Sequence, residues 1–356
     1  MNELNLEDYG LSREVLAQVE LDTDSIPARV LAVHRERYEL ICEHGKVAGR
    51  LKSSTYFAGS SEDFPTTGDF VLIHYNPTGE SPIVKTLPRG SFFSRRDPDK
   101  GRGEQAVAAN FDYVFIMQSL NQDFNLKRLE RYITLAWQSG GVPVLILTKA
   151  DLVPDFEEQM EAVREIAFGV DIHAVSAKAG TGLEALTSYL QPRKTVVFLG
   201  SSGVGKSSLV NRLADKEIME VREIRDDDDK GRHTTTHRQL LLLENGSMII
   251  DTPGMRELGM WAVDSGLSEA FSDVEGYFPH CKFSDCQHKS EPGCAVREAL
   301  EIGDLSWERW ESYLRLQREA RYAEDRAAYL QISRERGKAL SKWSKQKRKD
   351  WGEARW

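Results

Sequence analysis

The stretch LGSSGVGKSSLVNRL, residues 199–213, decides how the rest of the chain is interpreted. It contains G-x-x-x-x-G-K-S, preceded by the apolar run TVVFLG and followed by a helix-like segment. In this strand–loop–helix context the motif predicts a loop whose backbone N–H groups surround phosphates at the positive end of a helix dipole. We expect Lys206 to reach the β- and γ-phosphates and the Ser207 hydroxyl to bind Mg²⁺. The predicted contacts are Gly200, Ser201, Ser202, Gly203, Val204, Gly205, Lys206, Ser207 and Ser208.

A second apolar run, SMIIDTPG at residues 247–254, supplies the next part of the site. An Asp at a strand end beside a phosphate loop can hold Mg²⁺, so Asp251 is a candidate. Gly254 would let a backbone N–H approach the γ-phosphate. Between the two runs lies KGRHTTTHRQL, residues 230–240, which offers a threonine to close over Mg²⁺. The candidates are Thr234, Thr235 and Thr236, of which we favour Thr235.

Two other motifs indicate the base. TKAD, residues 148–151, follows the apolar run VPVLIL and is similar to N-K-x-D, whose Asp carboxylate accepts hydrogen bonds from the ring N–H and amino group of guanine. Adenine has no such donor pair on that edge, so Asp151 favours GTP over ATP. Thr148 replaces the Asn whose amide braces this loop, so one brace is expected to be missing. SAK, residues 176–178, would place the Ala177 N–H on guanine O6. The predicted base contacts are Thr148, Lys149, Ala150, Asp151, Ser176 and Ala177.

The order of these motifs is unusual, because the base-reading segments precede the phosphate loop. Hydrogen bonds in a sheet depend on spatial neighbours and not on connectivity, and a domain tolerates new termini where its old ends lie close together. We therefore interpret the region as a circularly permuted GTPase domain. The permutation places the DTPG segment at the end of the domain, directly before a cysteine cluster.

The rest of the chain is organised around this domain. The 356 residues, 40% apolar and 29% charged, are typical of a globular protein with several cores. Five short β-rich runs predict an N-terminal OB-fold β-barrel, although an SH3-like barrel has a similar pattern. Alternating strands and helices then predict an α/β P-loop GTPase domain with a mainly parallel sheet, followed by an α-helical zinc-binding domain. The predicted boundaries are 1–27 (lead-in), 28–90 (OB-fold), 91–109 (linker), 110–264 (GTPase domain) and 265–356 (zinc-binding and helical C-terminal domain).

Charge and localisation signals point to a cytoplasmic protein with a possible RNA partner. The net charge is −9, but residues 331–356 hold nine Lys/Arg against three Asp/Glu. A basic tail on an acidic body is either a nucleic-acid contact or a solvated helix end. No apolar run reaches the length of a membrane span, and the acidic N-terminus lacks a signal-peptide pattern. Candidate RNA contacts are Arg35, Arg37, Lys46, Arg50 and Lys52 of the barrel, Arg89, Phe92, Phe93, Arg95 and Arg96 of the linker, and Trp343, Trp351 and Trp356 of the tail.

Three of the four cysteines lie within 14 residues, in HCKFSDCQHKSEPGC. Cys281, Cys286 and Cys294 with one histidine suit a closed tetrahedral Zn²⁺ site. A short polar loop needs the stabilisation of a bound metal because it buries few apolar side chains. From the residues alone, His280 and His288 are both possible fourth ligands. Cys42, on a predicted barrel strand, is interpreted as a small buried residue.

These features together resemble the circularly permuted GTPases of the ribosome small-subunit-dependent GTPase A family. The resemblance extends from the barrel through AANFDYVFIMQSLNQDFNLKRLERYI and GRHTTT to the cysteine cluster. It implies an OB barrel, a permuted GTPase domain and a zinc domain that takes His288 as ligand. It also implies binding to the small ribosomal subunit and its rRNA late in assembly, with GTP hydrolysis stimulated by the subunit. We expect a monomer with GTP/GDP, Mg²⁺ and one structural Zn²⁺ as cofactors.

The catalytic group for hydrolysis is less obvious. Many GTPases carry Gln directly after D-x-x-G to orient the attacking water, but that position here is Met255. His233, beside the threonine run, is the nearest polar candidate, with His237 behind it. The family pattern GRHTTT favours a catalytic role for His233 over that of an exposed loop histidine.

Two other functional classes are compatible with parts of this pattern. An RNA-binding scaffold with weak nucleotide turnover would share the barrel and the tail, although intact Lys206, Ser207 and Asp251 argue against a vestigial site. A P-loop small-molecule kinase would share the phosphate loop, although TKAD with SAK argues against it.

Overall fold

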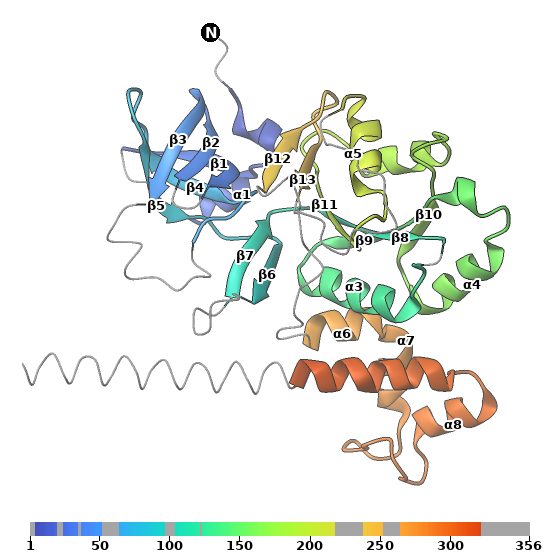
Figure 1. Ribbon diagram of the computed structural model, residues 1–356. Helices are drawn as coiled ribbons and strands as arrows, with labels where there is room; N and C mark the ends of the chain where they lie inside the picture. The colour runs from blue at the N-terminus through green and yellow to red at the C-terminus, as the bar shows by residue number, and fades with distance from the viewer. Residues whose placement is uncertain are drawn as a thin grey trace, which may run out of the picture.

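We describe a computed structural model of the chain, which covers residues 4–19, 24–34, 37–51, 64–96, 104–121, 123–217, 238–251 and 264–321. Figure 1 shows a β-barrel beside an α/β region, with a helical C-terminal part beneath the α/β region. The predicted fold class is confirmed in all three parts. No helix in the described part of the chain has the length and apolar character needed to cross a membrane.

The N-terminal part is a five-stranded barrel. A 3₁₀ helix η1 (Leu6–Tyr9) and helix α1 (Arg13–Ala17) precede β1 (Ser25–His34), β2 (Arg37–Cys42), β3 (Gly45–Leu51), β4 (Phe70–His74) and β5 (Ser81–Thr86). The strands pair in the order β1-β2-β3-β5-β4, and β4 pairs back with β1 to close the barrel. Only β3 and β5 run parallel among these pairs. This closed topology is that of the OB-fold and not of the SH3-like alternative.

A hairpin follows within the segment predicted as a linker, residues 91–109. Strands β6 (Phe92–Arg96) and β7 (Glu104–Ala109) pair antiparallel. Phe93 is buried and stacks on Phe111 at a ring distance of 4.8 Å. Arg89 lies over the Phe92 ring and pairs with the buried Asp69 at 2.8 Å. The prediction of Phe93 as an RNA contact was therefore wrong, because its buried ring closes a core between barrel and sheet.

The central region is a parallel sheet. Its strands are β8 (Tyr113–Ser119), β9 (Val142–Thr148), β10 (Asp171–Ala174), β11 (Thr195–Gly200), β12 (Gln239–Leu242) and β13 (Met248–Asp251). They lie in the order β10-β9-β8-β11-β13-β12, in which β12 alone is antiparallel to its neighbour. The phosphate-loop strand β11 therefore lies at the centre, between the first and last strands of the permuted sheet.

Helices cover both faces of this sheet because alternate strand residues point to opposite sides. On one face, α3 (Leu126–Gln138) and α4 (Glu157–Ile166) pack against Val114, Leu145 and Val197. On the other, α5 (Lys206–Ala214) and η3 (Leu183–Ser188) pack against Phe115, Ile146 and Phe198. The mainly parallel sheet predicted from the sequence is confirmed, and its coverage on both faces explains why the strand sequences are almost continuously apolar.

The C-terminal part packs beneath α3 (Figure 1). It contains α6 (Asp264–Ala270), α7 (Ser272–Glu275), η5 (Phe278–His280), α8 (Ala295–Ile302) and a helix over residues 307–321. Helix α6 approaches α3 closely, since a Cβ on Gly266 would lie 2.5 Å from the Thr134 carbonyl oxygen. Gly266 N–H also donates to Gln138 Oε1 at 3.0 Å.

Besides the Phe93 core, a strand pairing and a buried arginine join the barrel to the α/β region. Strand β1 pairs with β12 at Ala32 and Gln239, which merges the two sheets into one of 11 strands. Arg29 of β1, only 1% exposed, donates to the carbonyl oxygens of Gly68, Asn110 and Tyr9 and to Thr195 Oγ1. Its burial lowers the pKa of Arg29 to about 10, which leaves the guanidinium charged at neutral pH.

Arg29 is expected to contribute more to stability than any exposed arginine at the same junction. Arg29→Met should lower the free energy of unfolding by about 3 kcal/mol or more, because several buried oxygens lose their donor at about 1–3 kcal/mol each. Arg193→Met is the matched control, since Arg193 pairs with Asp8 at 3.1 Å in a solvent-exposed setting worth less than about 1 kcal/mol. Urea unfolding followed by circular dichroism measures both, and equal losses would contradict the role of Arg29.

Candidate functional site

The phosphate loop connects the central strand β11 to helix α5. At Gly200, the last residue of β11, a Cβ would lie 2.9 Å from the Met117 carbonyl oxygen, so only glycine fits beside β8. Gly203 and Gly205 have φ values of 74° and 101°, a region that side chains disfavour. Each of the three positions therefore requires glycine for a steric reason. Together they allow the loop to turn into the N-terminus of α5.

Asp251 lies beside this loop because β13 pairs in parallel with β11. It is the last residue of β13 and is buried, and its Oδ1 lies 2.8 Å from Lys206 Nζ. Two residues predicted to serve phosphates and Mg²⁺ are therefore in direct contact, although 45 positions separate them in the sequence.

Thr148 joins the base-reading loop to the phosphate loop. It is the last residue of β9, is 4% exposed, and its hydroxyl donates to the Val204 carbonyl oxygen at 2.6 Å. The expectation that replacing Asn with Thr leaves the loop without a brace was wrong. The shorter hydroxyl reaches the phosphate loop because the ends of β9 and β11 lie on the same edge of the sheet.

The TKAD and SAK segments are bonded to each other. Lys149 has a left-handed backbone with φ 61°, which turns the chain so that Asp151 follows in the 3₁₀ helix η2 (Ala150–Leu152). The buried Ser176 hydroxyl donates to Asp151 Oδ1 at 2.6 Å, and Ala150 N–H donates to the Val175 carbonyl oxygen at 3.2 Å. Asp151 itself is exposed, so its carboxylate is oriented by Ser176 and accessible to a ligand.

All these loops therefore meet at the carboxyl edge of the parallel strands, which is where open α/β sheets bind ligands. Some predicted residues lie outside the described part of the chain: Thr234, Thr235, Thr236, His233, His237, Gly254 and Met255. The chain resumes at Arg238 and continues into β12.

A contact that the sequence analysis missed holds the start of the phosphate loop. The Ser201 hydroxyl donates to Asp123 Oδ2 in the β8–α3 connection. Arg128 of α3 pairs with the same carboxylate at 2.9 Å and donates to Gln118 Oε1 at 3.1 Å. An Asp and an Arg near a helix start carry no spacing signature, so no sequence signal distinguishes them from ordinary surface residues.

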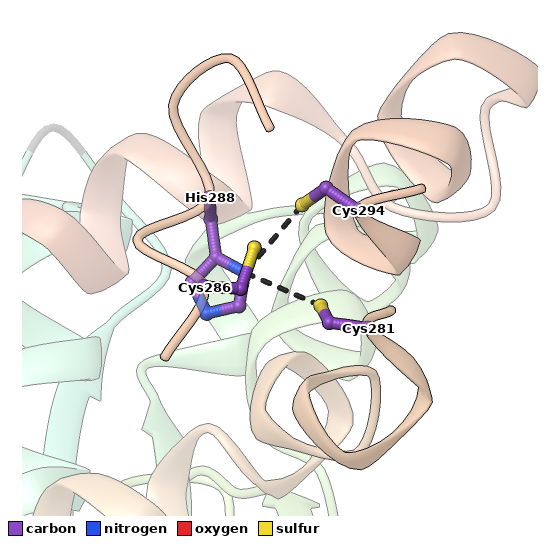
Figure 2. Close-up of side chains that lie close together, drawn as sticks. All are labelled: Cys281, Cys286, His288 and Cys294. Carbon is purple, nitrogen blue, oxygen red and sulfur yellow. Dashed lines mark hydrogen bonds between the residues drawn. The ribbon is translucent and has the colours of Figure 1, made fainter. Parts of the chain in front are cut away.

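The cysteine cluster forms a second site, in the C-terminal part. Figure 2 shows Cys281, Cys286, His288 and Cys294 turned toward one another. Their ligand atoms all lie within 4.8 Å of one another, and His288 Nδ1 is 3.5 Å from the Sγ atoms of Cys281 and Cys294. Tetrahedral Zn²⁺ with sulfur and nitrogen ligands needs about 3.6 Å between them, so the donor set fits zinc. His288, and not His280, belongs to this group.

The protonation states and the surroundings also suit a metal. Burial lowers the pKa of His288, which favours the neutral imidazole that binds metals. Desolvation, then the neighbouring thiols, raises the pKa of Cys286 to about 11, so thiolates here need a nearby cation. The Glu291 carboxylate accepts from the N–H groups of Gln287, Lys289 and Ser290 and shapes the loop. Phe278 stacks on the His288 ring at 4.4 Å.

Comparisons with known proteins agree with this geometry. The family model described as RsgA GTPase matches residues 86–261. The chain is 46% identical to Small ribosomal subunit biogenesis GTPase RsgA 1 of Listeria monocytogenes over 95% of this chain and 96% of the relative. The crystal structure of YjeQ from Thermotoga maritima superposes with a TM-score of 0.62 at 26% identity, covering 82% of this chain and 97% of that one.

A second solved structure has the same fold. YloQ, described as a circularly permuted GTPase, superposes with a TM-score of 0.60 at 23% identity and covers 86% of this chain and 99% of its own. The strand order and the motif order are those of a circularly permuted GTPase, and the Listeria relative matches nearly the whole length of the chain. The chain therefore belongs to the RsgA GTPase family.

Proposed function

We propose that this protein is a GTP hydrolase that binds the small ribosomal subunit and acts in its maturation. The observation that carries the proposal is the bonding of the base-reading loop to the phosphate loop, Thr148 Oγ1 to the Val204 oxygen, at one edge of the sheet. The name of the Listeria relative, a small ribosomal subunit biogenesis GTPase, supplies the partner. A cytoplasmic location follows from that partner, and we expect a monomer.

Guanine specificity rests on Asp151. Its carboxylate, oriented by Ser176, would accept hydrogen bonds from the guanine ring N–H and amino group, and the Ala177 N–H would donate to O6. Lys149 would lie along the base. Adenine offers no donor pair to the carboxylate, so bound ATP would leave Asp151 without the hydrogen bonds that guanine supplies, and a site built to hydrogen-bond its ligand rejects an analogue that lacks those groups.

The phosphates would be held by the loop backbone and Lys206. In the nucleotide complex Lys206 would exchange its contact with Asp251 for the β- and γ-phosphates, because a phosphate carries more charge than a carboxylate. Asp251 would then hold Mg²⁺ through water, with the Ser207 hydroxyl as a direct ligand. The 2.8 Å separation of Lys206 Nζ and Asp251 Oδ1 supports this exchange, since both groups already lie next to the phosphate loop.

The hydrolytic residues are proposed from sequence. Thr235 would close over Mg²⁺, Gly254 would contact the γ-phosphate, and His233 would orient the attacking water that Met255 cannot hold. His233 and Thr235 precede β12 in the chain and Gly254 and Met255 follow β13, and β13 pairs directly with the phosphate-loop strand β11. This position in the chain supports the assignment.

Contact with rRNA would begin on the barrel. Arg37 and Arg50 lie directly opposite each other on β2 and β3, and Lys46 is exposed on the same hairpin. Arg37 pairs with Glu80 at 3.1 Å in a largely exposed setting, a contact worth less than about 1 kcal/mol that a phosphate backbone would replace. Arg35, Lys52 and the tail tryptophans lie outside the described residues. Arg89 is engaged with Asp69, which removes it from the set of proposed RNA contacts.

The cysteine cluster would hold one structural Zn²⁺. Cys281, Cys286, His288 and Cys294 would fill all four positions and leave none for catalysis. The metal would fix the loop between η5 and α8 against the aromatic rings of Phe278 and Trp310, which contact His288.

The function is tested by GTP turnover with and without purified small ribosomal subunits. Subunits should raise turnover of GTP but not of ATP, and His233→Ala should lower the stimulated rate on the order of 100-fold while leaving GTP affinity nearly unchanged.

Turnover unaffected by subunits would favour the RNA-binding scaffold. ATP competing equally with GTP would favour the P-loop kinase, and an equal loss of binding and turnover in the variant would exclude His233 as catalyst.

Thr148 offers a test of the bond between the two loops. Thr148→Val has the same shape but leaves the Val204 oxygen without its donor, so GDP should dissociate about tenfold faster, the equivalent of about 1.4 kcal/mol. Thr148→Ser keeps the hydroxyl and should behave like the wild type. Stopped-flow release of a fluorescent GDP analogue measures both, and equal rates for the valine and serine variants would contradict the bracing role.

The four ligands of the cysteine cluster predict how much zinc the protein carries. The purified protein should carry about one zinc ion per chain, and Cys286→Ser should lose nearly all of it. Cys42→Ala is the matched control, because Cys42 is buried in the barrel away from the cluster and its variant should keep the metal. Mass spectrometry of the metal content distinguishes these outcomes. Zinc retained by Cys286→Ser would exclude Cys286 as a ligand.

A further inference from the structure

Helix α3 contacts both the phosphate loop and the C-terminal part of the chain. At its start, Arg128 holds Asp123, whose carboxylate accepts the Ser201 hydroxyl. Arg128 also donates to the Asp123 carbonyl oxygen, as does the buried Gln118 amide. The first residue of the phosphate loop after β11 is therefore bonded to a carboxylate whose position α3 determines.

The opposite side of α3 is bound to the helix over residues 307–321. Glu130 is 4% exposed, and its two oxygens lie 3.2 Å from Arg309 and 3.3 Å from Arg315. Arg309 in turn pairs with Asp273 at 2.9 Å and lies 3.9 Å above the Phe271 ring. Removing one partner of such a buried ion pair is strongly destabilising, so α3 cannot shift without the C-terminal helix.

The two contacts leave α3 in different directions. Residues two apart on a helix do not face each other, which is why Arg128 points to the phosphate loop and Glu130 to the C-terminal helix. The backbone hydrogen bonds of a helix make its turns move together. Figure 1 shows α3 between the sheet and the C-terminal helices, so a displacement beneath it is transmitted to the edge that holds the phosphate loop.

We infer that α3 couples the C-terminal zinc-bearing part of the chain to nucleotide binding, with Asp123 as a positioning residue for the phosphate loop through Ser201. This rests on the proposed function, since it concerns the same nucleotide site. The ion pairs of Glu130 fix α3, α3 fixes Asp123, and Asp123 fixes Ser201. A change that loosens Glu130 therefore acts on the nucleotide through the Ser201 hydroxyl.

A double-mutant cycle tests the coupling. Ser201→Ala removes the hydroxyl without changing charge, and Glu130→Gln weakens the ion pairs of α3. Each should speed GDP release about fivefold, the scale of one partly exposed polar contact, and the double variant should be no faster than the faster single one. Ser201→Thr keeps the hydroxyl and should restore the wild-type rate. The preference for GDP over ADP should stay constant throughout, because Asp151 is untouched, whereas general unfolding would lower it.

The chain provides a matched control on the same two helices. Arg131 and Glu319 also join α3 to the C-terminal helix, at 3.7 Å, but their side chains are 42% and 39% exposed, against 4% for Glu130, so Glu319→Gln should release GDP like the wild type. If Glu130→Gln does not fold, as judged by circular dichroism, Arg315→Gln replaces it in the cycle.

The outcomes separate this inference from the proposed function. The coupling would be overturned if the rate increases of the two single variants multiply in the double variant, or if Glu130→Gln and Arg315→Gln both release GDP at the wild-type rate. In either case, a wild-type protein that binds GDP would still uphold the proposed function. A wild-type protein that does not prefer GDP to ADP would contradict the proposed function and the inference with it.

Discussion

The parallel pairing of β11 with β8 on one side and β13 on the other is the constraint on which the site depends. It aligns Val197 with both Val114 and Ile250, so three strands that are far apart in the chain end at one edge. Hydrogen bonds between strands do not depend on connectivity, so the described loops of the site meet at this edge although the base-reading motifs come first. The same arrangement puts the new ends of the domain beside the phosphate-loop strand. The barrel joins ahead of β8 and the C-terminal part follows β13.

Both flanking parts of the chain pack directly against the α/β region that carries the nucleotide site. The barrel is fixed by the buried Arg29 and by the pairing of β1 with β12, the strand that follows the threonine run. The C-terminal part is fixed by Glu130 and the close approach of Gly266 to α3. If the inferred coupling holds, a binding event on the C-terminal part would alter the site without any residue of that part touching the nucleotide.

The sequence predicted those features that depend on neighbours along the chain. Strand periodicity, the glycine loop of residues 200–205 and the tight spacing of Cys281 to Cys294 are local patterns, and the barrel topology followed from five short strands. Contacts that depend on the folded chain were missed. Arg29 looks like one more charged residue on a barrel strand, Phe93 looks exposed in a polar segment, and the Thr148 hydroxyl finds its acceptor 56 residues away.

The central claim is that these separated segments bind one guanine nucleotide, and a crystal structure with a non-hydrolysable GTP analogue and Mg²⁺ tests it most directly. The account predicts the Asp151 carboxylate within hydrogen-bonding distance of the guanine ring N–H and amino group. In the same structure Lys206 should contact the β- and γ-phosphates and be released from Asp251. A base bound away from Asp151 while Lys206 holds the phosphates would contradict it.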